Sequence, residues 1–171
     1  MLARRGWLSL SVGRLCPGGN YGSGMRYFED LRVGNKFNSA DYEMTEGEII
    51  EFGRRFDPQP FHTDPAAAAG TLFGRLVASG WHTAAVSMRL MVLGEMGLDG
   101  GVIGQGMESL RWPRPVLPGD RLRVVTEIVE LRPAPARPDR GVVKLRCRTY
   151  NQDGKVVQEM TATLLAARRP A

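Results

Sequence analysis

Two side chains that can exchange protons with a bound substrate lie close together in the sequence. Asp57 offers a carboxylate and His62 an imidazole, and Pro58 and Pro60 stand between them. A fully extended chain would separate the two backbones by about 16 Å, so both side chains can reach one substrate atom only if the segment turns back. Each proline fixes its own φ and moves the preceding residue away from helical geometry, which predicts a rigid, irregular loop. The pair is therefore a candidate for general acid and base catalysis.

The same stretch also has a purely structural interpretation. An Asp-Pro pair is common in turns, and Thr63-Asp64-Pro65 is typical of a helix cap followed by proline at the first helical position. His62 could be a core histidine held by hydrogen bonds. The only other histidine, His82, is interpreted as a packing residue rather than a catalytic one. Spacing alone does not decide between chemistry and packing, so the rest of the chain has to.

Composition excludes several classes of function. The chain has 171 residues, of which 43% are hydrophobic, and this suits one globular domain with a substantial core. Its net charge is +5, but three of the 23 basic residues lie within residues 1–24, which contain no acid. The remaining 20 face 18 acidic residues, so the charge gives little support for a nucleic-acid partner. We expect no membrane partner and no metal, because no apolar run approaches the ~20 residues of a membrane span and no metal-binding motif occurs.

Residues 1–24 differ from the rest of the chain. They are rich in Arg, Ser, Gly and Leu and resemble a mitochondrial presequence more than a secretory signal, whereas ordinary globular composition begins at Met25. We expect an N-terminal extension or a disordered tail at 1–24 and one domain at 25–171. Of the two cysteines, Cys16 lies in the extension and only Cys147 in the domain, so the domain has no internal disulfide. This lack of a disulfide predicts a reducing, cytoplasmic location. A mitochondrial location is the alternative if residues 1–24 are a presequence.

Helical signals surround the Asp-His segment. A strand is predicted over Lys36–Met44, and a helix then begins at Thr45 with a capping box to Glu48 and runs to about Arg55. A short alanine-rich helix is predicted over Pro65–Ala69. The longest helix is predicted from Gly80 to about residue 96, where Trp, Ala, Val and Met recur at three- and four-residue spacings. Because it is apolar almost all round, we expect it to be buried.

Four strands are predicted to follow this long helix. Apolar and polar residues alternate along them, which predicts an antiparallel sheet with one buried and one wet face. Only the long helix remains to cover the buried face. The strands are predicted at residues 101–112, 120–131, 141–150 and 155–167.

Three blocks of the sequence resemble one family. The segment from Asp57 to His62, Asp-Pro-Gln-Pro-Phe-His, resembles the Asp-x-Asn-Pro-x-His motif of the MaoC-like dehydratases, the family of (R)-specific enoyl-CoA hydratases. Ala78-Ser79-Gly80 and the block 110–120 agree with it, and the resemblance spans roughly residues 28–167. It implies an α+β fold, a single hotdog domain in which an antiparallel sheet wraps a long central helix. It also implies a homodimer.

The resemblance implies a hydro-lyase acting on an enoyl or 3-hydroxyacyl thioester of the acyl-CoA type. Asp57 and His62 would activate water, and the backbone N–H of Gly80 would stabilise the developing oxyanion. No cofactor is implied, since CoA is the carrier of the substrate. The chain departs from the motif at Phe56, where Gly is usual, and at Gln59, where Asn is usual.

Three further residues are expected to bind substrate: Gln59, Ser79 and Trp81. The bulk of Trp81 near the expected acyl channel leaves the substrate's size open. Two other functions also remain open. One is an acyl-CoA thioesterase, which needs a carboxylate and an oxyanion donor but no histidine. The other is a non-catalytic protein that binds acyl thioesters on the same fold.

Overall fold

The computed structural model describes residues 25–170. The interpretation of residues 1–24 as an extension or presequence lies outside the described residues. A six-stranded antiparallel sheet runs in the order β1-β4-β5-β6-β3, and β2 pairs with β4 away from that path. The strands are β1 (Lys36–Asn38), β2 (Tyr42–Glu43), β3 (Ile103–Arg111), β4 (Arg121–Pro133), β5 (Arg140–Tyr150) and β6 (Val156–Ala167).

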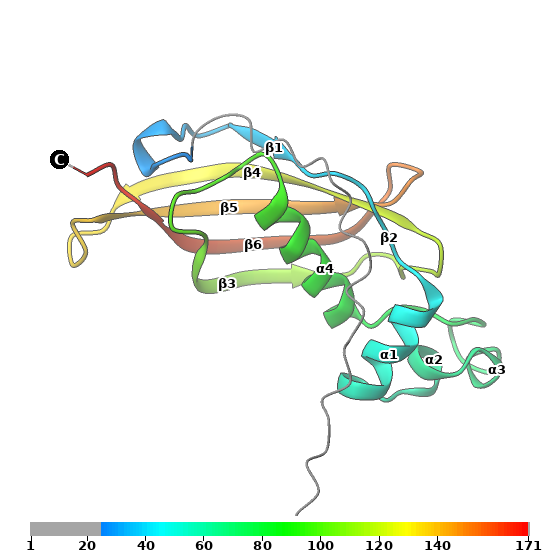
Figure 1. Ribbon diagram of the computed structural model, residues 1–171. Helices are drawn as coiled ribbons and strands as arrows, with labels where there is room; N and C mark the ends of the chain where they lie inside the picture. The colour runs from blue at the N-terminus through cyan, green and yellow to red at the C-terminus, as the bar shows by residue number, and fades with distance from the viewer. Residues whose placement is uncertain (1–24, 171) are drawn as a thin grey trace, which may run out of the picture.

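Alternation along the strands gives the sheet one buried face. Successive side chains of a strand point to opposite faces, so every second residue of β4 and β5 turns toward the core. Figure 1 shows α4 (Gly80–Leu93) crossing that face, and its buried side packs there. The four predicted long strands and the helix against them are confirmed, with strand ends shifted by no more than two residues. Buried strand residues include Leu122, Val124, Ile128, Val143, Leu145, Cys147, Met160 and Leu164.

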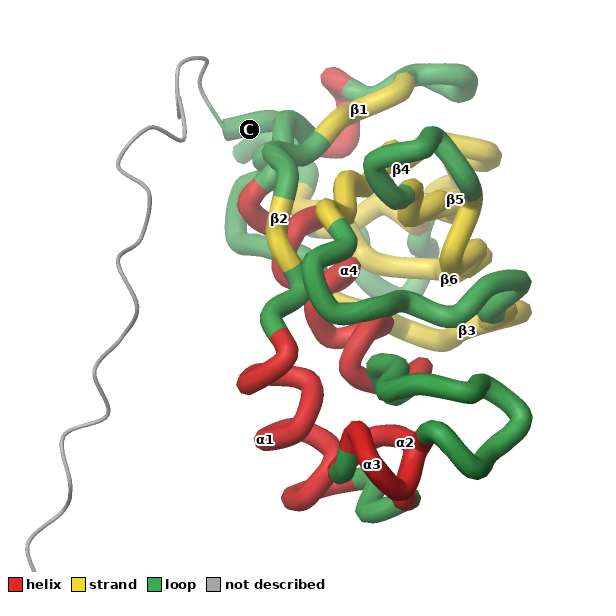
Figure 2. The backbone as a smooth tube through the Cα atoms, turned by 90° about the vertical axis from the view of Figure 1, so that its right-hand side faces the viewer, coloured by secondary structure: helices red, strands yellow, loops and turns green. Residues whose placement is uncertain are grey.

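Three of the remaining helices, α1 (Glu46–Phe56), α2 (Pro60–Thr63) and α3 (Pro65–Ala68), gather beyond the sheet, next to one end of α4 (Figures 1 and 2). Thr45 caps α1 as predicted, because its hydroxyl accepts from the Glu48 N–H and the Glu48 carboxylate accepts from the Thr45 N–H. Asp64 caps α3 by a simpler arrangement, in which its carboxylate accepts the N–H groups of Ala66 and Ala67. The short 3-10 helix η1 (Phe28–Asp30) lies apart from them, where Phe28 packs against Gly141 of β5.

Two local predictions were wrong. The single strand expected over 36–44 is split into β1 and β2, because the Ser39 hydroxyl accepts the N–H of Val124 in place of a backbone carbonyl and interrupts the ladder. The segment after Pro58 is not wholly irregular, since Pro60 occupies the first position of a helical turn, α2, where its missing N–H costs nothing.

The prediction that the long helix is buried holds for only one of its faces. One face of α4 is buried, while Trp81 is 61% exposed, Met88 44% and Val92 48%. The helix also ends at Leu93, short of the predicted end. Gly94 is its C-cap and has extended backbone geometry, and a Cβ at this position would lie 2.9 Å from the Asn38 carbonyl oxygen. Every helix within residues 25–170 is too short or too polar to span a lipid bilayer.

Candidate active site

The chain turns back between Asp57 and His62, as joint action requires. Asp57 ends α1 as its C-cap, and its carbonyl accepts the N–H of Gln59 at 2.7 Å before α2 begins. This reversal places His62 Nε2 3.3 Å from Asp57 Oδ2. Gly53 permits the close approach of α1 to this turn, because a Cβ there would lie 2.5 Å from the His62 carbonyl oxygen.

The buried ring of His62 is held in one tautomer. Its Nδ1 lies 2.8 Å from the carbonyl oxygen of Val77. A carbonyl can only accept a hydrogen bond, so Nδ1 carries the proton in this contact. In the neutral ring, Nε2 is then the bare nitrogen, and it faces the carboxylate of Asp57.

Asp57 is held on both of its carboxylate oxygens. The Ser79 hydroxyl donates to Oδ2 at 2.7 Å, and the Gln59 side-chain amide donates to Oδ1 at 2.8 Å. Partial burial opposes ionisation, but these two hydrogen bonds and the neighbouring His62 outweigh it and lower the pKa of Asp57 below its usual value. Asp57 is therefore a carboxylate at neutral pH.

An ionised Asp57 and a neutral His62 present two hydrogen-bond acceptors to each other. Two acceptors do not bond directly, but a water molecule can donate one hydrogen to each. If His62 takes up a proton, its Nε2–H can donate to Asp57 instead. The pair can thus accept a proton from water and later return it, which is the function of a general base and acid.

Gly80 opens α4 beside this pair. Its N–H points out of the first turn at the positive end of the helix dipole, and no described residue accepts it. The Trp112 ring packs against its Cα, so a Cβ on Gly80 would lie 2.8 Å from two ring atoms. Trp112 is itself fixed by its Nε1–H, which donates to the buried Gln158 side chain at 2.8 Å. The arrangement leaves the Gly80 N–H without a partner among the described residues and able to stabilise negative charge.

Of the three residues predicted to bind substrate, two contact Asp57 and the third is exposed. Gln59 and Ser79 both donate to Asp57, and Ser79 also accepts the Trp81 N–H at 3.2 Å, so their polar groups are engaged with the carboxylate and the helix cap. The Trp81 side chain is exposed and meets the Trp112 ring edge to face, at 5.5 Å between centroids.

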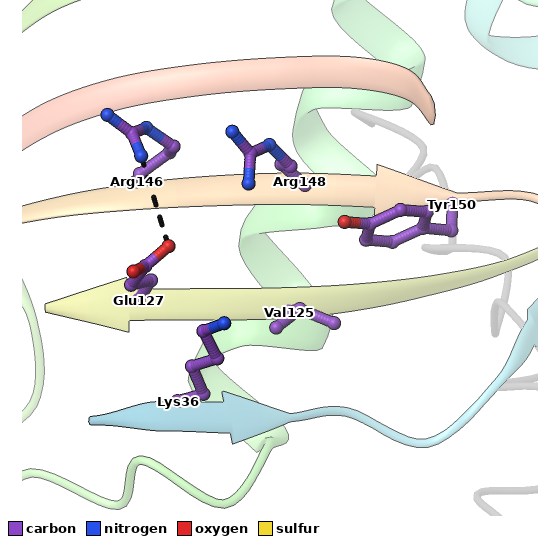
Figure 3. Close-up of a pocket in the computed structure, with 6 residues that line it drawn as sticks. All are labelled: Lys36, Val125, Glu127, Arg146, Arg148 and Tyr150. Atoms are coloured by element: carbon purple, nitrogen blue, oxygen red, sulfur yellow. Dashed lines mark ion pairs between the residues drawn. The ribbon is translucent and has the colours of Figure 1, made fainter. Parts of the chain in front are cut away.

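A small hollow of about 50 Å³ lies on the outer face of the sheet, turned away from α4 (Figure 3). Glu127 and Arg146 form an ion pair within it at 3.9 Å. No residue of the Asp57 and His62 pair lines it, so it is separate from the candidate site. Within residues 25–170, no group of three or more His, Cys, Asp or Glu side chains is placed to hold a metal ion.

Sequence reasoning missed three contributors to the site. The Val77 carbonyl is a backbone group, so no residue type could reveal it. Gly53 and Trp112 do have types that matter, but only tertiary contacts with the His62 backbone and with Gly80 show why. A glycine inside a predicted helix was the one available signal, because an interior helical glycine usually has a packing reason.

Known proteins share this fold and segment order. The MaoC like domain family matches residues 30–147. The crystal structure of the MaoC-like dehydratase from Rhodospirillum rubrum is 47% identical and superposes with a TM-score of 0.82, covering 85% of this chain and 99% of that one. The R-hydratase PhaJ1 from Pseudomonas aeruginosa is 29% identical, with a TM-score of 0.68 over 84% of this chain and 86% of its own.

Sequence comparison agrees. The 3-hydroxyacyl-thioester dehydratase Z of Mycobacterium tuberculosis (strain CDC 1551 / Oshkosh) is 33% identical over 115 residues, which is 61% of this chain and 75% of that protein. The likeness to solved structures confirms the predicted hotdog fold, with its antiparallel sheet and central helix. The family match covers both the Asp-His turn and the start of α4. This chain belongs to the MaoC-like dehydratase family.

Proposed function

We propose that this protein is a hydro-lyase that adds water to an enoyl thioester, or removes it from a 3-hydroxyacyl thioester, with acyl-CoA as the substrate type. The observation that carries the proposal is the 3.3 Å approach of His62 Nε2 to Asp57 Oδ2 beside the free N–H of Gly80. Two similar proteins, an R-hydratase and a 3-hydroxyacyl-thioester dehydratase, are named for hydration and for dehydration, and this supports the proposal.

The proposed reaction assigns proton transfer to the Asp57 and His62 pair and charge stabilisation to Gly80. The Asp57 and His62 pair takes a proton from water while the water oxygen bonds to the β-carbon of the enoyl group. The electron pair of the double bond moves toward the thioester oxygen, where the Gly80 N–H stabilises the enolate. The pair then returns a proton to the α-carbon, so that one water molecule has been added across the double bond. Dehydration follows the same steps in reverse.

A hydration assay tests this proposal. Crotonyl-CoA absorbs in the ultraviolet through its conjugated double bond, so its loss can be followed directly for wild type, Asp57→Asn and His62→Asn. Both substitutions remove a group that accepts a proton while keeping its approximate shape. We expect each to lower kcat by at least about 100-fold. Equal rates in all three proteins would refute the proposed roles.

The thioesterase alternative predicts a different product. A hydrolase would release free CoA, which a colorimetric thiol reagent detects, whereas hydration keeps the thioester intact. The position of His62 against Asp57 favours hydration, because thioester hydrolysis assisted by a carboxylate does not need this imidazole. A non-catalytic protein would bind acyl-CoA in a calorimeter without any turnover.

We also propose a homodimer formed through the edge of the sheet and the uncovered face of α4. Strand β3 lies at a sheet edge and exposes Ile103 and Met107, while α4 exposes Trp81, Met88 and Val92. Apolar side chains grouped beside an unpaired strand favour association. In a homodimer, a second copy of this chain would cover these exposed apolar side chains.

We propose a reducing, cytoplasmic compartment as the setting. Cys147 is a buried free thiol among the described residues, and burial raises its pKa to about 11, so this thiol stays protonated and unreactive.

A further inference from the structure

A cleft of about 180 Å³ opens between α1 and α4. Both of its walls adjoin the candidate catalytic pair. On α1, Phe56 immediately precedes Asp57; on α4, His82 lies three residues after Ser79, whose hydroxyl donates to Asp57. The cleft is lined by Glu48, Glu51, Phe52, Arg55, Phe56 and His82.

His82 carries an unmet hydrogen-bonding requirement in this cleft. Only 7% of the residue is exposed, and its Nδ1 is fully buried with no hydrogen-bond partner among the described residues. Leaving such a group unpaired costs about 1–3 kcal/mol. The ring cannot easily turn away, because it stacks on Phe52 with 4.7 Å between centroids and a 6° interplanar angle. The fold therefore holds a polar atom in place without satisfying it.

The protonation state of His82 follows from its neighbours. Burial lowers the pKa of His82, while the charge of Glu48 opposes that shift without reversing it. The ring is therefore neutral at pH 7, with one N–H donor and one bare acceptor. The other charged groups that line the cleft, Glu51 and Arg55, form an exposed ion pair at 3.7 Å and do not neutralise the ring.

Glu48 does not supply the missing partner, because no described group bonds to His82 Nδ1 and the Glu48 carboxylate is held by other residues. The Tyr42 hydroxyl donates to Oε1 at 2.6 Å, and Thr45 donates to Oε2 through its hydroxyl at 2.7 Å and its N–H at 3.3 Å. Among the residues that line the cleft, His82 therefore carries the buried nitrogen, Nδ1, that lacks a hydrogen-bond partner.

The lining restricts what can bind. Glu48 and Glu51 outnumber the single cation Arg55, so a phosphate or carboxylate is disfavoured there. The Phe52 and Phe56 rings favour methylene and methyl groups. An amide or a hydroxyl carries both a donor and an acceptor, so either group satisfies His82 in whichever tautomer the ring adopts.

We infer that this cleft binds an uncharged segment of the thioester substrate and that His82 forms a hydrogen bond to an amide or hydroxyl group within it. The inference rests on the proposed function, because it assigns the cleft to the same substrate. Two parts of such a substrate have this chemistry. One is the amide-containing arm between the thioester sulfur and the nucleotide of CoA, and the other is a hydroxyl substituent on the acyl chain.

Calorimetric binding distinguishes the two sources without turnover. Butyryl-CoA is saturated and has no double bond to hydrate. Butyryl-N-acetylcysteamine keeps only the amide nearest the sulfur, and 4-hydroxybutyryl-CoA adds a hydroxyl. Each is titrated into wild type, His82→Leu, which removes the polar atoms, and His82→Asn, which retains an amide. Arg89→Lys, an exposed and charge-conserving change on the same helix, is the control.

If the arm is the bound segment, His82→Leu weakens butyryl-CoA about tenfold, the size of one lost hydrogen bond, and leaves the truncated thioester less affected. If the acyl hydroxyl is bound, the loss appears only for 4-hydroxybutyryl-CoA. In both cases His82→Asn recovers part of the affinity and Arg89→Lys has no effect. Equal affinities of wild type and His82→Leu for all three ligands would overturn the inference, as would a wild type that binds none of them.

A spectroscopic readout guards against misfolding of the leucine variant. The chain contains two histidines, so ring-labelled histidine gives two sets of NMR signals, and a His62→Asn variant assigns them. Saturating butyryl-CoA or 4-hydroxybutyryl-CoA is expected to shift the His82 signals in the wild type. Unchanged His82 signals with both ligands would also refute the inference. A wild type that shows these shifts but no hydration of crotonyl-CoA would refute the proposed function alone.

Discussion

Asp57 stays ionised although its surroundings are partly buried, because other side chains donate to both of its oxygens. Ser79 comes from the cap of α4 and Gln59 from the turn before α2, so two separate elements fix the carboxylate in place. His62 is fixed independently, by the Val77 carbonyl. A histidine that served only packing would not need a bare nitrogen facing a carboxylate.

Removing the Ser79 hydroxyl should change the pH dependence of activity. This hydrogen bond lowers the pKa of Asp57, so Ser79→Ala raises that pKa. The acidic limb of kcat/KM, where Asp57 gains its proton, should then move to higher pH. In a folded control, Thr63→Ala removes a hydrogen bond to the Gln59 carbonyl without touching Asp57, and its profile should match wild type.

The lowered pKa of Asp57 also makes the free energy of unfolding depend on pH. A carboxyl with a lowered folded-state pKa stabilises the fold above the pKa of the unfolded chain, and this contribution is lost as pH falls through the folded pKa. Ser79→Ala should therefore lower unfolding free energy at neutral pH more than at strongly acidic pH. A deficit in urea unfolding that is the same at both pH values would contradict this account of Asp57.

The tautomer of His62 is open to direct measurement. In the neutral ring, nitrogen-detected NMR should show the proton on Nδ1 and a bare Nε2, because the Val77 carbonyl accepts from Nδ1. A ring protonated on Nε2 instead would mean that His62 donates to Asp57 in its resting state. It could not then accept a proton from water.

Among the elements, the start of α4 connects catalysis with packing. Ser79 caps the helix and holds Asp57, while Gly80 offers its N–H and accommodates the Trp112 ring. Trp112 is anchored in turn by Gln158 on β6. The position of the candidate oxyanion donor thus depends on Trp112, which directly follows β3, and on β6 as well as on the helix itself.

Gly80→Ala should therefore lower the stability of the folded protein. Its Cβ would lie 2.8 Å from Trp112 ring atoms, and overpacking of this kind destabilises by about 1–3 kcal/mol in urea unfolding. Combining it with Trp112→Leu should give less destabilisation than the sum of the two single changes, because the clash disappears. Additive costs, or a Gly80→Ala protein as stable as wild type, would contradict this packing.

Sequence patterns predicted elements whose determinants are local. The capping box at Thr45, the helix cap at Asp64 and the alternation along the four long strands depend on residues a few positions apart. The turn α2 was not predicted, because the two prolines indicate only where the backbone is stiff. The split between β1 and β2 depends on a hydrogen bond from Val124 to Ser39, which is 85 positions away in sequence.

For the whole molecule, the exposed side of α4 is the largest departure from the sequence prediction. Its almost all-round apolar character predicted burial, yet a single chain covers only one face. The same apolar residues are consistent with burial against a second copy. The candidate site itself was located from residue spacing and resemblance, whereas its tautomer and its contacts could come only from the folded chain.

A charged residue on the β3 edge tests the proposed dimer. Met107 is 49% exposed on that strand, so Met107→Lys should not disturb the core of one chain but should disfavour pairing of two edges. Light scattering during gel filtration should give a dimer mass for wild type and a smaller average mass for the variant. Lys155→Gln, in the distant turn before β6, serves as the control. A monomeric wild type would contradict the proposal.

The central claim is that Asp57 and His62 act as one unit on a shared water molecule, and a double-mutant cycle on crotonyl-CoA hydration tests it most directly. Groups that act together are strongly non-additive, so Asp57→Asn, His62→Asn and the double variant should lose similar factors in kcat. Losses that multiply in the double variant would show that the two residues act independently. Single variants as fast as wild type would contradict the account altogether.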